Sequence, residues 1–489
     1  MVRGVVWSGS SLAGGRILVL ASTSVLARLL SPRDFGLVAL ALIFTTVLDS
    51  VRDLGVNQAL IVSGGGEAEA DTAFSLTVLI GTGLALILAA ASSLVARLLG
   101  TPPLFALLAV LSLNLPLRCL GLTHYALAQR RLDFRSRTVA DLVEIVVRGV
   151  VSIGLALAGA GPWSLVGGYL GGTVAWTVLL WILAAFRPRL RIERSALSPL
   201  LRFGGGLTVI GIVGMVMGYA DNLFVGGVLG PAALGIYSLG YRLPETLIVD
   251  VASAVGVVLF PALTMVRRSA LRAATLTATR SVAALTLPVA VLLLILADPL
   301  VAVLFGRRWH EAARVVQILS IGFAGWPIGQ VAGSAFKATR RIDVMVKLAV
   351  PQGVILVVLI AVFVRQGLVA VAACQSAVRL VFVLIGMYVS TTVLGFRGRD
   401  LWGAIWPALA AAAGLAIVTF AVGQVVHPPL LRLVVSTVCG GAVYVALTGL
   451  LAGELVSDLG RFARSSPTIH ALVRVAPADV SEAPLESQA

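Results

Sequence analysis

Charged side chains lie deep inside several long apolar segments of this chain, where a bilayer would not accept them cheaply. An arginine at the centre of a membrane-spanning helix costs about 2.5–3.5 kcal/mol even on the most permissive insertion scale. Such side chains therefore need a polar partner or a water-filled cavity. The basic residues at this depth are Arg16, Arg118, Arg148, Arg242 and Arg379, and the acidic ones are Glu144, Asp221 and Glu245.

This set of residues favours the binding of an anion. Five positive charges against three negative charges leave the predicted cavity basic. The planar guanidinium of arginine donates two parallel hydrogen bonds to phosphate oxygens, whereas a lysine acts as a point charge. We therefore predict that arginines of the cavity bind an anionic head group. Glu144, Asp221 and Glu245 are expected to line the cavity or to couple transport to an ion.

Pairing within one helix offers a structural role for part of this set. Glu144 and Arg148 have i, i+4 spacing and can neutralise each other on one helix face. Arg242 and Glu245 have i, i+3 spacing and can do the same. Arg118 can extend its side chain toward the inner head groups.

Structural roles are open to the remaining charged residues as well. Arg16 and Arg379 lack an acidic residue at helical spacing, so a structural role requires a partner on another helix. Asp221 stands beside Asn222 and is either a proton or cation site or an acceptor for a cavity arginine. A solvated or self-paired charged cluster ends the second apolar segment and comprises Asp49, Arg52 and Asp53.

Motifs of enzymes and of metal sites are missing from the sequence. There is no nucleotide-binding P-loop, no G-x-S-x-G elbow and no H-E-x-x-H. The histidines lack ligand spacing and are His124, His310, His427 and His470. The cysteines lie in apolar runs, which predicts free thiols, and are Cys119, Cys374 and Cys439. We therefore predict no enzyme, no metal and no cofactor, with transport driven by an ion or substrate gradient or by the membrane potential.

Composition predicts an all-α polytopic membrane protein. The 489 residues are 59% hydrophobic and 12% charged, with mean hydropathy +1.02, whereas soluble domains carry about 25% charged residues. The net charge of +15 is expected to meet anionic lipid, not nucleic acid. Glycine pairs such as Gly167-Gly168 and Gly171-Gly172 predict close helix packing. Fourteen spans are predicted over 5–29, 33–54, 73–99, 103–128, 137–159, 162–185, 205–229, 232–260, 275–299, 312–336, 343–364, 369–394, 402–426 and 430–455.

The distribution of arginines predicts the orientation of these spans. Basic residues are more frequent in alternate loops, and the positive-inside rule places those loops in the cytoplasm. Both termini are then cytoplasmic, and we predict no cleavable signal peptide. The basic residues of the predicted cytoplasmic loops are Arg130, Arg131, Arg135, Arg137, Arg187, Arg189, Arg191, Arg194, Arg267, Arg268, Arg272, Lys337, Arg340, Arg341, Lys347, Arg397 and Arg399.

Three motifs recur in the same order about two hundred residues apart and predict an internal repeat. The pattern L-x-P-x-x-x-G occurs at Leu30–Gly36 and Leu229–Gly235. LVARLLG at 94–100 returns as LVAVLFG at 300–306, and AQRRLDF at 128–134 returns as ATRRIDV at 338–344. Transporters built from repeats bind substrate between them near the midplane. We predict a six-helix lobe at 1–190, a second at 191–400, two extra helices at 401–455 and a disordered cytoplasmic tail at 456–489.

Four stretches resemble the polysaccharide transporter family, which contains O-antigen, colanic-acid and exopolysaccharide flippases of the multidrug/oligosaccharidyl-lipid/polysaccharide exporter superfamily. They read LLSPRDFGLVALA, DLGVNQALI, ALAQRRLDF and ADNLFVGGVLGPAALGIYSLGYRLP, and the resemblance extends to about Leu455. It implies two lobes in a V with alternating access in the bacterial inner membrane. The implied substrate is an undecaprenyl-pyrophosphate-linked oligosaccharide, moved from the inner to the outer leaflet.

The resemblance also implies a diphosphate site. The related lipid II flippases use arginines on helices 1, 2 and 8, and Arg52 matches by its place before the D-L-G motif. Arg16 and Arg242 match by helix and depth, and Arg148 and Arg379 are expected to assist them. Two further functions remain open. A drug or cation antiporter would need an acidic, aromatic cavity, and a membrane scaffold that recruits a polysaccharide polymerase or glycosyltransferases would not need the buried arginines.

Overall fold

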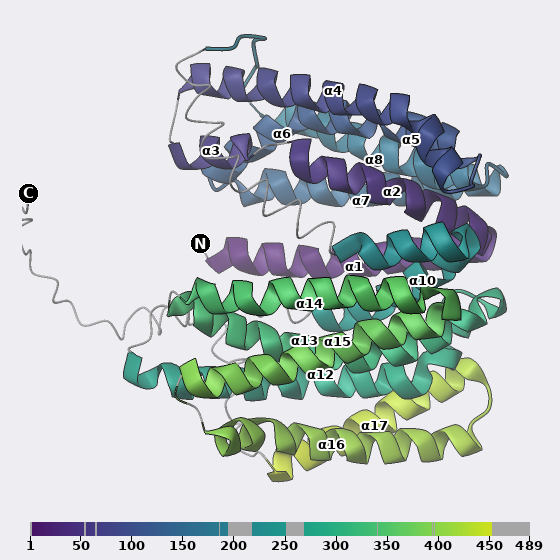
Figure 1. The fold of residues 1–489 in the computed structure, drawn as a ribbon, viewed down its shortest axis with the longest axis vertical. Helices are drawn as coiled ribbons and strands as arrows, with labels where there is room; N and C mark the ends of the chain where they lie inside the picture. Colours follow the sequence, from purple (N-terminus) through teal and green to yellow (C-terminus); the bar gives the residue numbers. More distant parts are fainter. Residues whose placement is uncertain are drawn as a thin grey trace, which may run out of the picture.

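The computed structural model describes residues 2–52, 55–63, 66–184, 186–193, 218–250, 268–339, 341–393, 395 and 397–451. In these ranges the chain is almost entirely helical and contains no strand. The helices lie roughly parallel in one elongated bundle (Figure 1). The predicted all-α membrane fold is therefore confirmed. Nine helical segments of the described chain are long and apolar enough to cross a bilayer, and the full count of fourteen stays a prediction.

The first half of the bundle follows the predicted spans closely. Its helices are α1 (Val2–Leu29), α2 (Pro32–Arg52), α3 (Val56–Ser63), α4 (Glu67–Leu98), α5 (Leu104–Leu111), α6 (Asn114–Arg130), α7 (Phe134–Leu157) and α8 (Pro162–Leu183). The short helix α3 was not predicted. The span predicted over 103–128 is confirmed as one candidate membrane span, Leu104–Arg130. It consists of α5 and α6, separated by a turn at Ser112–Leu113, because Pro116 has no N–H to donate and fits in the first turn of a new helix.

The second half begins with helical residues 218–224 and continues through elements that match the predicted spans. These elements are η1 (Val225–Leu229), α10 (Pro231–Pro244), η2 (Glu245–Asp250), α12 (Arg268–Leu304), η3 (Arg307–Trp309), α13 (His310–Ala338), α14 (Ile342–Phe363), η4 (Val364–Gln366) and α15 (Leu368–Val393). The additional pair is α16 (Gly398–Val425) and α17 (Pro429–Leu451). The predicted tail 456–489, and Asp53, Arg194 and Arg340 among the predicted charged residues, lie outside the described residues.

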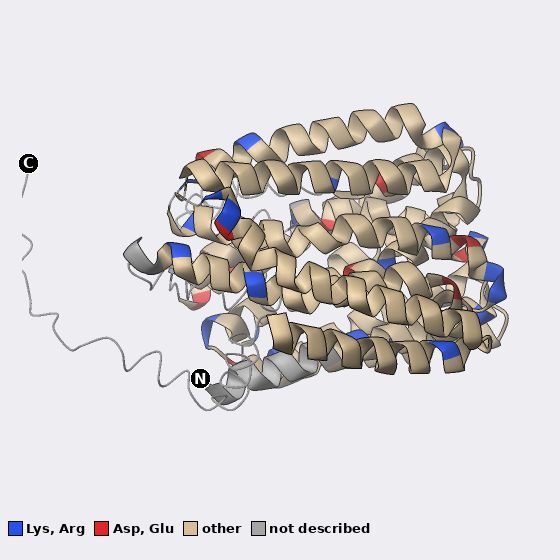
Figure 2. Ribbon diagram, turned by 90° about the horizontal axis from the view of Figure 1, so that it is seen from below, with Lys and Arg blue, Asp and Glu red and all other residues tan. Residues whose placement is uncertain are grey.

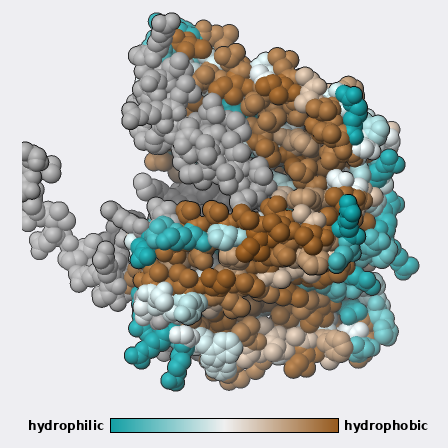
Figure 3. Space-filling model, in the orientation of Figure 1, coloured by the Kyte–Doolittle hydropathy of each residue, from teal (hydrophilic) through white to brown (hydrophobic). Residues whose placement is uncertain are grey.

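Charge and hydropathy divide the bundle along its length. Lysine, arginine, aspartate and glutamate gather at the two ends of the helices, and few mark their middle portions (Figure 2). Apolar surface covers the flanks between hydrophilic ends (Figure 3). The start of α1 and the end of α17 lie toward the same end of the bundle (Figure 1). This is the arrangement of a multi-pass membrane protein with the start of α1 and the end of α17 on one side.

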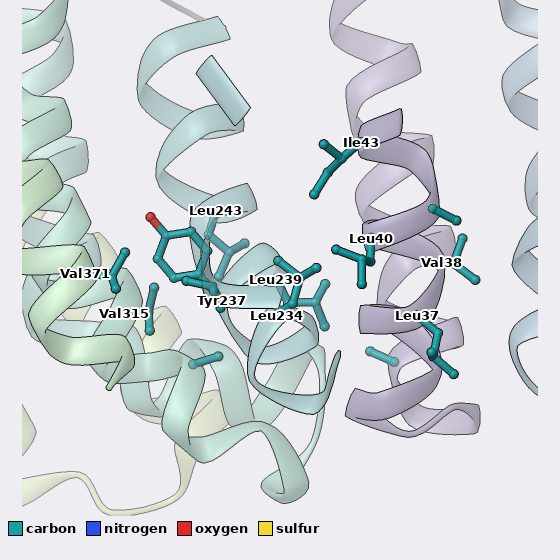
Figure 4. Packing of buried hydrophobic residues seen from close by; sticks show 14 of the residues in the cluster. Leu37, Val38, Leu40, Ile43, Leu234, Tyr237, Leu239, Leu243, Val315 and Val371 are labelled. Carbon is teal, nitrogen blue, oxygen red and sulfur yellow. The ribbon is translucent and has the colours of Figure 1, made fainter. Parts of the chain in front are cut away.

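The two copies of the L-x-P-x-x-x-G motif pack against each other. Gly36 on α2 and Gly235 on α10 approach so closely that a Cβ on either would overlap the proline carbonyl that opens the other helix, at Pro231 or Pro32. The two contacts are nearly equivalent. A Cβ on Gly36 would lie 2.9 Å from the Gly235 nitrogen, and a Cβ on Gly235 would lie 3.0 Å from the Gly36 nitrogen. Further along α2, Leu40 and Ile43 point toward α10 (Figure 4). A repeated sequence motif thus brings the backbones of the two halves into direct contact.

A second contact joins the halves at the same end. The indole Nε1 of Trp309 donates to the Ala27 carbonyl at 2.8 Å, and Arg308 donates to the Leu30 carbonyl at 3.2 Å. In return, Arg28 donates to carbonyls at the end of α12. Helix ends leave carbonyls without an intrahelical partner, and here each half supplies the missing donors to the other. This end of the bundle, which we predict to be extracytoplasmic, is closed.

Candidate functional site

Glu144 is the centre of a buried ionic cluster in the first half. Its side chain lies near the middle of α7 and is only 8% exposed. One carboxylate oxygen accepts from Arg118 of α6 at 2.8 Å and also from Arg148, one turn further along α7. The predicted pair with Arg148 is therefore confirmed. Arg118 turns toward Glu144, so the prediction that its side chain can extend to the head groups is wrong.

Aromatic rings on α8 support both arginines. The Arg118 guanidinium lies 4.6 Å from the Trp176 ring centroid, and that of Arg148 lies 4.4 Å from the Tyr169 centroid. Tyr169 and Trp176 have i, i+7 spacing and so share one helix face. Gly172 lies between them and lets α8 approach α7, since a Cβ there would lie 2.9 Å from the Glu144 carbonyl oxygen. The predicted close packing of these glycines is confirmed at this position.

An adjacent ion pair extends the cluster to the last turn of α2. Arg52 and Asp49 are joined at 2.7 Å, with side chains 9% and 17% exposed. This is the self-paired arrangement that the sequence allowed. Asp49 also lies within electrostatic reach of Arg118 and Glu144. We call the five residues Asp49, Arg52, Arg118, Glu144 and Arg148 the first-half cluster. Three arginines and two carboxylates leave it with a net charge of +1 if all are ionised.

Asp221 forms a separate buried site in the second half. It is 2% exposed and lies in helical residues 218–224, just before η1. Tyr237 of α10 donates its hydroxyl to one carboxylate oxygen at 2.9 Å, and Gln375 of α15 donates to the same oxygen at 3.4 Å. The other oxygen accepts from the backbone and side chain of Asn222. Asp221 is thus an acceptor for neutral donors, whereas the sequence predicted either a proton or cation site or an acceptor for a cavity arginine.

Arg379 of α15 stands next to this site without a direct bond to Asp221. It donates to the Tyr241 hydroxyl at 2.7 Å and lies 4.0 Å from the Phe323 ring centroid. Its charge acts on Asp221 over a longer distance. The sequence predicted that Arg379 needs a partner on another helix, and the partners found are the aromatic residues Tyr241 and Phe323. We call Asp221, Tyr237, Tyr241, Gln375 and Arg379 the second-half cluster.

The other predicted residues lie on α1 and at the junction of α10 with η2. Arg16 is exposed on α1, which packs against α7. Arg242 and Glu245 are half-buried at the end of α10 and the start of η2, and both act electrostatically on Tyr219. The structure therefore brings Arg52 and Arg148 into one cluster and Arg379 into the other.

Sequence reasoning did not identify the aromatic members of these clusters. Tyr169 and Trp176 at i, i+7, and Tyr237 and Tyr241 at i, i+4, each mark one helix face. That spacing was visible, yet such aromatic pairs also occur in ordinary apolar cores. An arginine that contacts the side chain distinguishes Tyr169, Trp176 and Tyr241 from ordinary core residues, and in each cluster that arginine lies on another helix.

Comparison with known proteins gives four consistent similarities. A family model described as polysaccharide biosynthesis protein matches residues 25–314. The succinoglycan biosynthesis transport protein ExoT of Rhizobium meliloti is 30% identical over 66% of this chain and 66% of its own length. The lipopolysaccharide biosynthesis protein WzxC of Escherichia coli is 24% identical over 87% and 88% of the two chains. Among solved structures, the lipid II flippase MurJ in an inward closed conformation superposes with TM-score 0.75 at 15% identity over 92% of this chain and all of its own.

Proposed function

Since this chain belongs to the family of polysaccharide biosynthesis proteins, we propose that it is a flippase for lipid-linked oligosaccharides. It moves an undecaprenyl-pyrophosphate-linked oligosaccharide from the inner to the outer leaflet of the bacterial inner membrane by alternating access. Transport is the activity named for ExoT, and MurJ is named a flippase, so the protein is a transporter and not an enzyme. Both termini are cytoplasmic in this proposal. Glycosyltransferases must make the substrate and a polymerase must consume it.

The observation that carries this proposal is the excess of arginine in the first-half cluster, where three arginines meet two carboxylates. The first-half cluster holds Glu144 with two arginines, and the Arg148 side chain is still 38% exposed. A diphosphate entering from the exposed side can replace Glu144 as the acceptor of these donors. Glu144 then serves to hold both guanidinium groups in position while the site is empty. An antiporter for cations has no use for this surplus of positive charge.

The proposed diphosphate contacts are Arg16, Arg52 and Arg242, with Arg148 and Arg379 as auxiliary cations. They come from both halves, so a substrate bound to them senses the relative position of the halves. Transport then requires the inner ends to close and the outer contact of Gly36 and Gly235 to part. Parting this contact also separates the side chains of α2 and α10 that pack beside it, including Leu40 and Leu234.

Asp221 has a supporting role in this proposal. Asp221 accepts from neutral donors, one of which is Tyr237, and Arg379 lies nearby. This arrangement favours a structural acceptor over a site for an exchangeable ion. Asp221→Asn should then leave the ion dependence of transport unchanged. A proton-coupled or cation-coupled carrier would lose that dependence in the same variant.

Removal of single arginines tests the proposal. A charge-assisted hydrogen bond contributes about 1.5–3 kcal/mol, and about 1.4 kcal/mol corresponds to one decade. Arg16→Ala or Arg242→Ala should therefore reduce transport at least roughly tenfold, and Arg→Lys should restore it only in part because the two-point contact is lost. Accumulation of inner-leaflet lipid-linked oligosaccharide, with protein quantified by blot, is the measurement.

The exposed Arg399 supplies the matched control, and its replacement by alanine should leave export unchanged. Normal export by well-expressed Arg16→Ala and Arg242→Ala proteins would contradict the proposed diphosphate site. It would favour the alternative function, a membrane scaffold that recruits a polymerase or glycosyltransferases.

A further inference from the structure

Residues 186–193 form an extended strap that is fastened to the start of α4. Three alternate backbone N–H groups donate to side chains of α4: Arg189 to Asp71 at 2.9 Å, Arg191 to Ser75 at 3.0 Å and Glu193 to Thr72 at 3.1 Å. The Ser75 hydroxyl returns a bond to the Arg189 carbonyl at 3.3 Å. All three side chains on α4 are buried. The strap lies at the end of the bundle where α4 begins (Figure 1).

The strap carries two kinds of exposed side chain. Arg189 and Arg191 flank a tight turn at Leu190, since the Arg191 N–H also donates to the Arg189 carbonyl at 2.9 Å. Leu190 and Ile192 both line a groove beside α4, and they are 82% and 46% exposed. Arginines next to exposed aliphatic side chains are typical of a segment at a membrane interface. This end of the bundle is the one that the positive-inside rule places at the inner leaflet.

An apolar groove of about 330 Å³ lies between the strap and α4. Its lining is mostly aliphatic and comprises Ser75, Val78, Leu79, Thr82, Leu190 and Ile192. Arg189 and Arg191 alternate in sequence with Leu190 and Ile192, which form one wall of the groove. A ligand that complements both features carries a negative charge next to a hydrocarbon chain.

The local charges leave this surface positive. Glu193 pairs with Arg191 at 3.2 Å, but that arginine is still 69% exposed. Arg187 uses one guanidinium nitrogen on carbonyls at the end of α8, and Arg189 is exposed. Asp71 is buried beneath the strap, and Glu67 and Glu69 lie in the first turn of α4, one to two turns from Ser75. Arg189 and Arg191 can therefore meet a phosphate from the membrane side.

We propose that the strap and the groove bind an anionic phospholipid of the inner leaflet. Arg189 and Arg191 bind the phosphate, and an acyl chain lies between α4 and the aliphatic residues Leu190 and Ile192. The site lies on the outer flank of α4, away from Arg16 and Arg242, so it is distinct from the proposed transport site. Its occupant anchors the segment that leaves α8 toward the second half.

Native mass spectrometry of the purified full-length chain tests this inference. The protein is exchanged into equimolar phosphatidylglycerol and phosphatidylcholine with identical acyl chains, and the ratio of retained lipids is measured. An arginine near an anionic surface favours binding by roughly fivefold. With two arginines the wild type should retain phosphatidylglycerol over phosphatidylcholine by about 25-fold, and R189Q/R191Q should lower this ratio to nearly one.

Matched variants separate the contribution of the arginines from that of the aliphatic side chains. R135Q/R399Q removes the same charge from exposed positions at the same end and should keep the wild-type ratio. L190S/I192S should lower retention of both lipids, whereas R189K/R191K should keep most of the preference because a point charge suffices for a head group. Equal retention of the two lipids by the wild type would overturn the proposal, as would a wild-type ratio in R189Q/R191Q.

A competition on the wild type distinguishes a lipid from a free anion. Glycerophosphoglycerol carries the head group without acyl chains, and we expect millimolar amounts to leave the lipid bound. Displacement of phosphatidylglycerol by this compound or by inorganic phosphate would identify a simple anion site and contradict the role of the groove.

Discussion

The first-half cluster and the second-half cluster hold their buried carboxylates in opposite ways. Glu144 accepts from two arginines, one of which is 38% exposed, whereas Asp221 accepts from a phenol, an amide and the Asn222 backbone. The partners of Glu144 are charged and partly accessible, so an incoming anion can take them over. The partners of Asp221 are neutral and buried, so they fix the position of α10 against α15. The two buried carboxylates thus sit in different polar chemistry.

The glycine contact is where the halves should respond alike, and it carries the largest expected effect. Gly36→Val and Gly235→Val each place side-chain atoms on a proline carbonyl of the other helix. Overpacking of this kind costs about 3 kcal/mol or more, so both variants should lose the folded, monodisperse protein in fluorescence size-exclusion chromatography.

Gly83→Val is the matched control, since a Cβ at Gly83 meets open space. Tolerance of Gly235→Val together with loss of Gly36→Val would show that only one half depends on the contact.

Removal of the two carboxylate charges should separate the halves. Glu144→Gln leaves Arg118 and Arg148 without a counter-ion, and we expect a loss of about 2 kcal/mol, below the value for a fully buried pair because both arginines are partly exposed. Millimolar diphosphate should restore this loss by replacing the carboxylate. Asp221→Asn should lose about 1 kcal/mol with no recovery. The thermal unfolding midpoint with and without diphosphate is the measurement.

The exposed Glu311 provides the control substitution for this pair, and Glu311→Gln should leave the midpoint nearly unchanged. Equal recovery of Glu144→Gln and Asp221→Asn by diphosphate would remove the distinction between the clusters.

The smallest effect should come from the phenol groups. Tyr237→Phe removes the 2.9 Å donor to Asp221, but Gln375 still donates to the same oxygen, so the loss should be about 0.5–1 kcal/mol. Tyr169→Phe keeps the ring face that contacts Arg148, so the cation–π contact persists and the cost should stay below about 0.5 kcal/mol. Thermal unfolding of the two variants in the same detergent compares them, and a larger loss for Tyr169→Phe would reverse the assignment.

Local patterns in the sequence predicted the local parts of the molecule. The i, i+4 spacing of Glu144 and Arg148 and the clustering of Asp49 with Arg52 both predicted ion pairs that form. The second arginine on Glu144 comes from α6, 26 residues away in the chain, and no periodicity links the two. The break before Asn114 was visible as Pro116, but apolar residues continue on both sides and favoured a single span.

The repeat was predicted from sequence, but its geometric consequence was not. Matching motifs at Leu30–Gly36 and Leu229–Gly235 indicate common local structure and say nothing about whether the copies meet. Their contact depends on how α2 crosses α10, which is set by packing of side chains from both halves, including Leu40 and Leu234. The aromatic supports of the arginines were missed for the same reason, since charge and ring lie on different helices.

The contact of Gly36 and Gly235 also determines how far other parts of the protein move. It lies at one end of α2 and α10 and can act as a fulcrum for the halves. Spanning helices extend about 30 Å from such a point. A rotation of about 10° there would separate the opposite ends of the halves by about 5 Å while the glycines stay in touch. A small rotation at this contact would then produce an opening at the opposite end that is about as wide as a phosphate group.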